Sequence, residues 1–191
     1  MPITMILQGT DSYTAPSFSL RQRLARQCWD ITWMLLFRTT PRPLHAWRRA
    51  LLRAFGARIG EHVHVHPSVK VWAPWNLRID SFVGIGEGAV LYSMDHIHIE
   101  SYAVVSQGSY LCAGTHDFNS PNMQLTTAPI IIKRHVWLCA QSFVCPGVVI
   151  AEGSVVAARG LVSRSLTEGW GVWAGVPVRR VSERDQQVNR P

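Results

Sequence analysis

Residues 132–162 read IKRHVWLCAQSFVCPGVVIAEGSVVAARGLV, and in this stretch an aliphatic residue returns at every sixth position. The same spacing starts at Ile59. Its members are all Ile, Leu or Val, in four runs: Ile59, Val65, Val71; Ile79, Ile85, Leu91; Ile99, Val105, Leu111; and Ile132, Leu138, Val144, Ile150, Val156, Val162. A helix repeats at 3.6 residues and a half-buried strand at two, so neither explains this period. A fixed short period is typical of a solenoid built from hexapeptide repeats.

The position four residues after each aliphatic residue is usually small or short, with Trp75, Asp95 and Leu166 as the exceptions. We expect three hexapeptides to form one triangular coil, with the aliphatic side chain inside and the small residue at a corner. Because one coil cannot bury its own apolar face, several coils must stack. The sequence therefore predicts a mainly β fold: a parallel β-helix over residues 58–181, after an α-helical segment at 1–57 and before a tail at 182–191 that is helical or frayed.

The register of six slips in three places. Two steps of eight, from Val71 to Ile79 and from Leu91 to Ile99, add a bulge of two residues at a corner. The third step, from Leu111 to Ile132, is much longer and predicts an excursion loop over residues 113–129. Loops that leave a solenoid commonly carry function, so we expect the chemistry in this loop.

The amino-terminal segment predicts two helices. The first spans Ser19 to Phe37, with Ser19 as its cap. Its main apolar face is formed by Leu24, Cys28, Ile31 and Leu35, and is widened by Trp29, Trp33, Met34 and Phe37. Two interpretations stay open: a helix at a membrane surface, or a helix packed on the β-helix or across a subunit interface.

The second helix runs over about residues 43–55 and ends at Gly56. Its apolar residues are Leu44, Trp47, Leu51 and Leu52, and its opposite, basic face holds Arg48, Arg49 and Arg53.

The chain carries a formal net charge of +7, and the excess is concentrated in residues 1–60, where Asp11 and Asp30 are the only acids. This balance favours an anionic surface, a phosphorylated ligand or membrane headgroups, with ordinary solvated arginines as the alternative. No recognition motif points to nucleic acid. The four cysteines form no disulfide-like pattern and no signal peptide is visible, which predicts a cytoplasmic protein, with peripheral attachment to the inner membrane face left open.

Several segments together resemble a known family. They are SQGSYLCAGTHDF at 106–118, APIIIKRHVW at 128–137, AGVPVRRV at 174–181, WAPWNLRI at 72–79 and the amino-terminal block from residue 17. They resemble the hexapeptide-repeat acyltransferases, and among these the sugar O-acetyltransferases of exopolysaccharide and colanic-acid biosynthesis. The resemblance implies a left-handed parallel β-helix and a homotrimer with active sites between subunits. It also implies acetyl-CoA as co-substrate, no required metal, and a sugar or lipid-linked glycan hydroxyl as acceptor.

His116 is the predicted catalytic residue. A hydroxyl must lose a proton as it attacks a thioester, and a neutral imidazole is a suitable base at neutral pH. His116 lies at the start of the excursion loop and matches the catalytic histidine of the family. Asp95, Asp117 and Asn119 are the predicted acceptor-binding residues. For Asp95, a turn in which the carboxylate binds its own backbone is an equal alternative.

The predicted cofactor site lies on the later coils. By resemblance, Ala140, Ala158, Ser163 and Arg179 match cofactor-contacting positions. Arg164 and Arg179 would supply charge for the phosphates, which arginine binds in bidentate fashion.

His62, His64 and His66 alternate, which raises the question of a metal site. No cysteine or well-placed carboxylate completes such a site, so the sequence favours surface or intersubunit roles and predicts no metal ligands. Two other functions stay open: an acetyltransferase with a small-molecule acceptor, such as serine, a drug or an amino sugar, and a non-catalytic β-helix scaffold.

Overall fold

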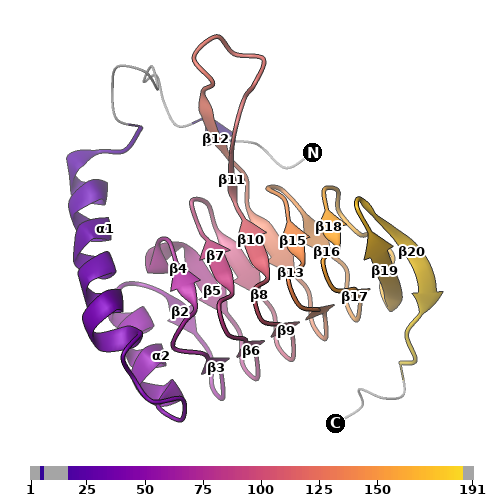
Figure 1. Ribbon diagram of the computed structural model, residues 1–191, viewed down its shortest axis with the longest axis horizontal. Helices are drawn as coiled ribbons and strands as arrows, with labels where there is room; N and C mark the ends of the chain where they lie inside the picture. The colour runs from indigo at the N-terminus through magenta and orange to yellow at the C-terminus, as the bar shows by residue number, and fades with distance from the viewer. Residues whose placement is uncertain (1–4, 7–16, 187–191) are drawn as a thin grey trace.

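The computed structural model describes residues 5–6 and 17–186, and most of them form a solenoid with three parallel sheets (Figure 1). The first sheet holds β2 (Arg58–Ile59), β5 (Leu77–Ile79), β8 (Ile97–Ile99), β13 (Ile130–Ile132) and β16 (Val149–Ile150). The second holds β3 (His64–Val65), β6 (Gly84–Ile85), β9 (Val104–Val105), β14 (Trp137–Leu138), β17 (Val155–Val156), β19 (Gly171–Gly175) and β20 (Val178–Glu183). The third holds β4 (Lys70–Val71), β7 (Val90–Tyr92), β10 (Tyr110–Cys112), β15 (Phe143–Val144) and β18 (Leu161–Val162).

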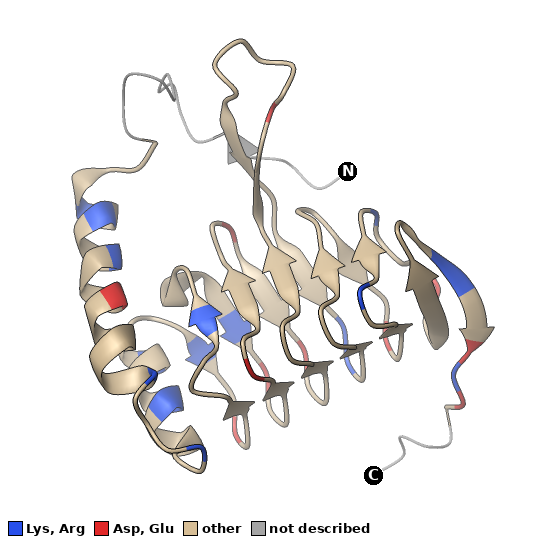
Figure 2. Ribbon diagram, viewed as in Figure 1, with Lys and Arg blue, Asp and Glu red and all other residues tan. Residues whose placement is uncertain are grey.

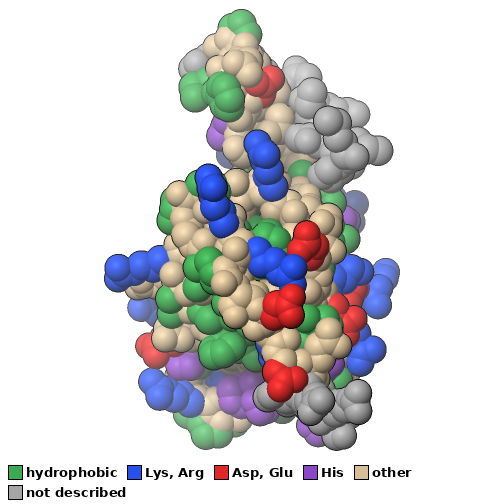
Figure 3. Space-filling view, turned by 90° about the vertical axis from the view of Figure 1, so that its right-hand side faces the viewer, with side chains coloured by type: hydrophobic (Ala, Val, Ile, Leu, Met, Phe, Trp, Pro, Cys, Tyr) green, Lys and Arg blue, Asp and Glu red, His purple; other side chains and the backbone are tan. Residues whose placement is uncertain are grey.

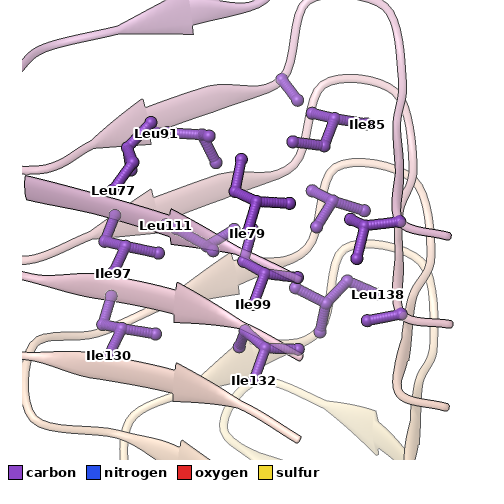
Figure 4. Close-up of a cluster of buried hydrophobic side chains, with 14 of the residues drawn as sticks. Leu77, Ile79, Ile85, Leu91, Ile97, Ile99, Leu111, Ile130, Ile132 and Leu138 are labelled. Carbon is purple, nitrogen blue, oxygen red and sulfur yellow. The ribbon is translucent and has the colours of Figure 1, made fainter. Parts of the chain in front are cut away.

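The aliphatic residues of the repeat form the core. Each of the fifteen is at most 8 % exposed, and they stack on their equivalents from coil to coil (Figure 4). Neighbouring coils are joined by backbone hydrogen bonds such as Gly60 N–H to Ile79 O at 2.7 Å and Gly86 N–H to Val105 O at 2.8 Å. The predicted period of six is confirmed.

The amino-terminal segment folds into α1 (Leu20–Thr32), a π-helical turn η1 (Trp33–Phe37) and α2 (His45–Ala54). Ser19 caps α1 in a capping box with Gln22, as predicted. The predicted apolar face is divided between two sides: Leu24 and Leu35 are 58 % and 57 % exposed, while Trp29 and Phe37 are fully buried. The wider π turn rotates Phe37 onto the side of Trp29, so the aromatic residues contact the solenoid and the aliphatic residues face outward.

The first coil explains why aromatic and basic residues face inward. Each coil donates backbone hydrogen bonds to the carbonyl groups of the following coil, so the carbonyl groups of the first coil have no coil before them. Side chains supply the missing donors: Trp29 to Val71 O (2.8 Å), Trp33 to Val69 O (2.8 Å), Arg48 to Val65 O (2.7 Å), Arg49 to Val63 O (3.0 Å) and Arg53 to Ile59 O (2.7 Å). Buried carbonyl groups need such partners.

Arg48 corrects the prediction for the second helix. The sequence assigned it to the basic face opposite the apolar residues, yet it is fully buried, and its guanidinium also donates to Thr40 Oγ1 and Pro41 O. Leu44 and Trp47, on the predicted apolar face, are 47 % and 45 % exposed.

The corner between the first and second sheets is formed by a continuous aromatic stack. We call His62, Phe82, Tyr102, His135 and Trp170 the aromatic ladder; consecutive ring centroids lie 5.1, 5.0, 5.1 and 6.1 Å apart. All five residues have positive φ, between 54° and 63°. Gly153 lies beneath Trp170, and a Cβ there would lie 2.3 Å from the Trp170 ring, so the last rung requires a glycine. Trp170 is thus the last rung of the ladder.

The predicted excursion loop forms a hairpin that projects from the solenoid (Figure 1). Its strands are β11 (Gly114–His116) and β12 (Leu125–Thr127), and β1 (Met5–Ile6) pairs with β12. At the far end, β20 continues to Glu183, so the prediction of a helical or frayed tail from Ser182 is wrong at its start; residues 187–191 lie outside the described part. In the described residues, no helix combines the length and the apolar character needed to cross a membrane.

Candidate active site

The corner between the third and first sheets carries the exceptions to the repeat. Trp75 and Asp95 occupy the position where a small residue is usual, and Thr115, in the next coil, is followed directly by His116. A short 3₁₀ turn, η2 (Pro74–Asn76), forms this corner in the first coil, and the hairpin leaves from it in the third. We call it the hairpin corner. The loop residue and two repeat exceptions therefore lie on one edge of the molecule.

Trp75 and Asp95 line the same pocket, which has a volume of about 270 Å³. Its lining residues are Phe18, Gln22, Arg26, Trp72, Trp75, Asn76, Met94, Asp95, His96 and Thr127. The wall therefore combines the start of α1, the hairpin corner and the base of the hairpin, because Thr127 pairs with Gly114 in β11. His116 lies two residues farther along β11, about 7 Å away at the rise of a strand.

Sequence reasoning missed the wall formed by Phe18, Gln22, Arg26 and Trp72. Their approach depends on the docking of α1, which no local pattern predicts. In the structure, Arg26 packs on another residue of the pocket wall: its guanidinium lies 4.2 Å from the centroid of the Trp72 ring. Trp75 could have been predicted as a pocket residue from the sequence, because it interrupts the hexapeptide repeat at the same position as Asp95.

His116 has a defined tautomer. Its Nδ1 lies 2.6 Å from the carbonyl oxygen of Met123, across the hairpin. A carbonyl oxygen only accepts hydrogen bonds, so Nδ1 carries the proton and Nε2 keeps its lone pair. The side chain is exposed. In the neutral ring Nε2 is therefore the acceptor nitrogen, and it has no hydrogen-bond partner among the described residues.

The predicted acceptor residues lie in different environments. Asp95 accepts a hydrogen bond from the backbone of His96 through Oδ1 at 2.6 Å, while Oδ2 has no hydrogen-bond partner among the described residues. Asp117 Oδ1 accepts from Asn119 N–H at 3.0 Å, so this pair shapes the tip of the hairpin. Asp95 lines the pocket, and Asp117 and Asn119 are not among its lining residues.

The predicted cofactor residues flank the third sheet. Ser163 and Arg164 follow β18 at the hairpin corner, whereas Ala140 precedes β15 and Ala158 precedes β18 at the opposite edge of this sheet. Arg179 is the exception, because it lies on β20 in the second sheet, where it is paired with Ala174. The side chains of Arg164 and Arg179 are exposed and have no hydrogen-bond or ion-pair partner among the described residues. Figure 3 shows basic side chains between the projecting hairpin and the carboxy-terminal end of the solenoid.

Cys112 and the three alternating histidines have structural surroundings. Burial raises the pKa of the Cys112 thiol, which favours its protonated form. His62 begins the aromatic ladder, His64 stacks on His45 at 4.7 Å, and His66 contacts Ser68 Oγ at 2.8 Å. Within residues 17–186, no three His, Cys, Asp or Glu side chains are grouped as they would be around a metal ion.

Known proteins resemble this chain over most of its length. No protein-family model matches the chain. The chain is 41 % identical over 161 residues to an Escherichia coli protein named "Putative colanic acid biosynthesis acetyltransferase WcaF", which covers 84 % of this chain and 88 % of the relative. A maltose O-acetyltransferase from Clostridium difficile superposes with a TM-score of 0.80 at 16 % identity, covering 88 % of this chain and 90 % of that one.

A hexapeptide-repeat acetyltransferase from Vibrio cholerae, solved with acetyl coenzyme A, also superposes with a TM-score of 0.80, at 21 % identity and over 89 % and 93 % of the two chains. These two structures share the fold, which confirms the left-handed parallel β-helix. The identity to the Escherichia coli relative extends over most of both chains and settles the family. The chain belongs to the hexapeptide-repeat acetyltransferases.

Proposed function

We propose that this enzyme transfers an acetyl group from acetyl-CoA to a hydroxyl of a sugar or glycan intermediate in exopolysaccharide biosynthesis, with His116 as the general base. The observation that carries the proposal is the bond from His116 Nδ1 to Met123 O, which leaves Nε2 free to accept a proton. Two curated relatives from Escherichia coli are named for colanic acid and lipopolysaccharide biosynthesis, which supports a polysaccharide acceptor.

The reaction needs one proton transfer in each direction. Nε2 of His116 takes the proton of the acceptor hydroxyl while the oxygen attacks the thioester carbonyl carbon. The tetrahedral intermediate then breaks the C–S bond, and the CoA sulfur leaves with the proton from the imidazolium. The Met123 carbonyl stabilises the imidazolium that exists between the two transfers, because Nδ1–H remains its donor.

The pocket beside the hairpin is the proposed acceptor site. The indole of Trp75 offers an apolar face of the kind that sugar rings pack against, and Asp95 and Asn76 add polar groups. The Trp72 ring carries the Arg26 guanidinium over its face and so supports a cation at the pocket wall. The open Oδ2 of Asp95 would accept a hydrogen bond from an acceptor hydroxyl. In this proposal Asp117 and Asn119 stabilise the hairpin tip through their hydrogen bond, and Asp95 makes the closer contact with the acceptor.

Acetyl-CoA would lie along the later coils. Arg164 and Arg179 are exposed cations without carboxylate partners among the described residues, so they are available for phosphates. Ala140 and Ala158 would let the pantetheine arm approach the backbone, and Ser163 would bind it at the hairpin corner. The family member from Vibrio cholerae was solved with acetyl coenzyme A, which supports this donor. The proposal requires no metal.

A homotrimer would complete the site. Phe118 at the hairpin tip is 81 % exposed, and Val104 and Trp137 on the second sheet are 42 % and 45 % exposed. A neighbouring copy would cover such apolar groups, and it would also bring together cofactor residues that flank the third sheet in one protomer. Sedimentation equilibrium tests this: we expect three copies, and a monomer would contradict the shared site.

The test of the function is consumption of the acetyl-CoA thioester, with wild type beside His116→Ala. The acceptors are free sugars, lipid-linked glycan precursors, serine and amino sugars. We expect turnover with a sugar or glycan, and a loss of about 10³-fold in kcat in the variant, with acetyl-CoA binding unchanged. Turnover with serine alone would favour the small-molecule acceptor. A protein that does not bind acetyl-CoA would overturn the proposal in favour of a scaffold.

A further inference from the structure

Helix α1 and the following turn η1 are together apolar on both sides, and only one side is used within the protomer. Trp29 and Phe37 are buried on the inner side. On the outer side, Leu20, Leu24, Ile31 and Leu35 are 67 %, 58 %, 47 % and 57 % exposed, at spacings of four, seven and four residues that place them in one row. We call these four residues the outer ridge. Met34, Leu36 and Trp47 extend the apolar surface at its carboxy-terminal end.

Arginines border the outer ridge. Arg21 and Arg23 are exposed in the first turns of α1 and lack ion-pair partners among the described residues, and exposed Arg38 follows η1 with its guanidinium 5.6 Å from the Trp33 ring centroid. Asp30 is the only acid in residues 17–57, and Arg26 pairs with it at 3.4 Å. Figure 2 shows that positions of basic residues outnumber those of acidic residues along the helices.

We propose that the outer ridge docks on the surface of a membrane that contains anionic phospholipids. An amphipathic helix with an aliphatic face and flanking arginines lies in the plane of such an interface, with the apolar face among the acyl chains and the cations at the headgroups. Two outer ridges packed on each other would bring Arg21, Arg23 and Arg38 of both copies together, so charge favours the bilayer over a second copy of the same surface.

Docking of α1 on a membrane would also bring the acceptor pocket close to the bilayer. The acceptor pocket is walled by Gln22 and Arg26, which share the inner face of the same helix with Trp29, so the pocket would lie one helix diameter, about 10 Å, from the headgroups. A second cavity, of about 360 Å³, continues between α1 and the third sheet and shares Arg26 and Trp72 with the first. This part of the inference depends on the proposed function: an acceptor with a lipid anchor would reach the pocket from the bilayer.

Vesicle co-sedimentation of the full chain tests the docking without any acetyl transfer. The vesicles contain phosphatidylcholine alone or phosphatidylcholine with phosphatidylglycerol. We expect binding to the anionic vesicles that weakens as salt is raised. Replacing Leu24, Ile31 and Leu35 by Ser should weaken it on the order of tenfold per side chain, since each loses roughly half of its burial free energy. Arg21→Glu with Arg23→Glu should weaken it by at least about fivefold per residue.

The matched control is Phe82→Ser, on the aromatic ladder, because Phe82 is as exposed as Ile31, at 48 % against 47 %. It should leave vesicle binding unchanged, and the thermal midpoint of each variant verifies folding. Absence of wild-type binding to anionic vesicles at low salt would overturn the proposal. The proposal would also be overturned if the triple variant bound vesicles like wild type. Weaker binding that arises only from dissociation of the assembly, as measured by sedimentation velocity, would overturn it as well. Loss of docking with intact turnover of a soluble sugar would separate this inference from the proposed reaction.

Discussion

Two corners of the same solenoid illustrate opposite uses of one repeat. The corner between the first and second sheets keeps the repeat in every coil, and its residues stack into the aromatic ladder with centroid distances near 5 Å. The hairpin corner breaks the repeat in consecutive coils, with Trp75, then Asp95, then the hairpin that carries His116. The regular corner joins coil to coil, and the irregular corner forms a pocket.

The difference teaches where to search a repeat protein for its site. A ring within the ladder has its faces against its neighbours, so it offers little more than an edge to a ligand. A residue that departs from the repeat has no equivalent above or below to stack on, and its side chain is free to face outward. Stability and function are thus assigned to different edges of each coil, and substitutions at the two corners should have separable effects.

The sharpest test is Asp95→Ala at the hairpin corner. Loss of a charged hydrogen bond to an acceptor hydroxyl should lower kcat/KM for the acceptor by about a hundredfold, equivalent to the upper range of roughly 3 kcal/mol for such bonds. The KM for acetyl-CoA and the thermal midpoint should not change. Steady-state kinetics with the acceptor varied at saturating acetyl-CoA measures this. Unchanged acceptor kinetics would mean that Asp95 only shapes its turn through His96.

The two corners can be compared directly by replacing one exposed arginine at each. Arg164 lies at the hairpin corner and Arg134 precedes His135 of the ladder, and neither side chain has an ion pair or a hydrogen bond among the described residues. Arg164→Ala should raise the KM for acetyl-CoA about tenfold, since a charge-assisted bond to phosphate is lost. Arg134→Ala should leave it unchanged. Equal effects of the two variants would assign the binding to general positive charge and not to the hairpin corner.

The sequence predicted the coils well because the period of six is a local property that burial enforces in every coil. It also pointed to His116 and Asp95, since both interrupt the pattern. It did not predict that Arg48 is buried or that α1 turns its aromatic side inward. Both depend on the unpaired carbonyl groups of the first coil, such as Val65 O and Val71 O, which exist only once the coils have formed. The pocket wall on α1 was missed for the same reason.

The aromatic ladder can be tested at Tyr102. Tyr102→Ala removes a ring stacked between Phe82 at 5.0 Å and His135 at 5.1 Å. We expect a loss of about 1 kcal/mol in the free energy of unfolding, the scale of aromatic pairing at a half-exposed site. Chemical denaturation measures it. The kinetic constants at fixed temperature should match wild type, and a selective loss of kcat would show that the two corners are coupled.

The smallest effect should come from the pH dependence of the ladder. Burial lowers the pKa of His135 below 6.5, with Arg134 and Arg184 adding to the effect and Glu152 opposing it. Between 6.5 and the lower folded-state pKa, the unfolded chain binds a proton that the folded chain does not. The free energy of unfolding should therefore fall as the pH drops through this window.

In His135→Phe this part of the pH dependence should disappear, because residue 135 no longer titrates while an aromatic ring remains in the ladder. Tyr102→Phe, which removes no group that titrates near neutral pH, should keep the wild-type slope. Unfolding midpoints in denaturant on both sides of pH 6.5 would measure the slopes. Equal slopes for His135→Phe and wild type would place the acid-sensitive group elsewhere, for example at His45 or His66, whose pKa values burial also lowers.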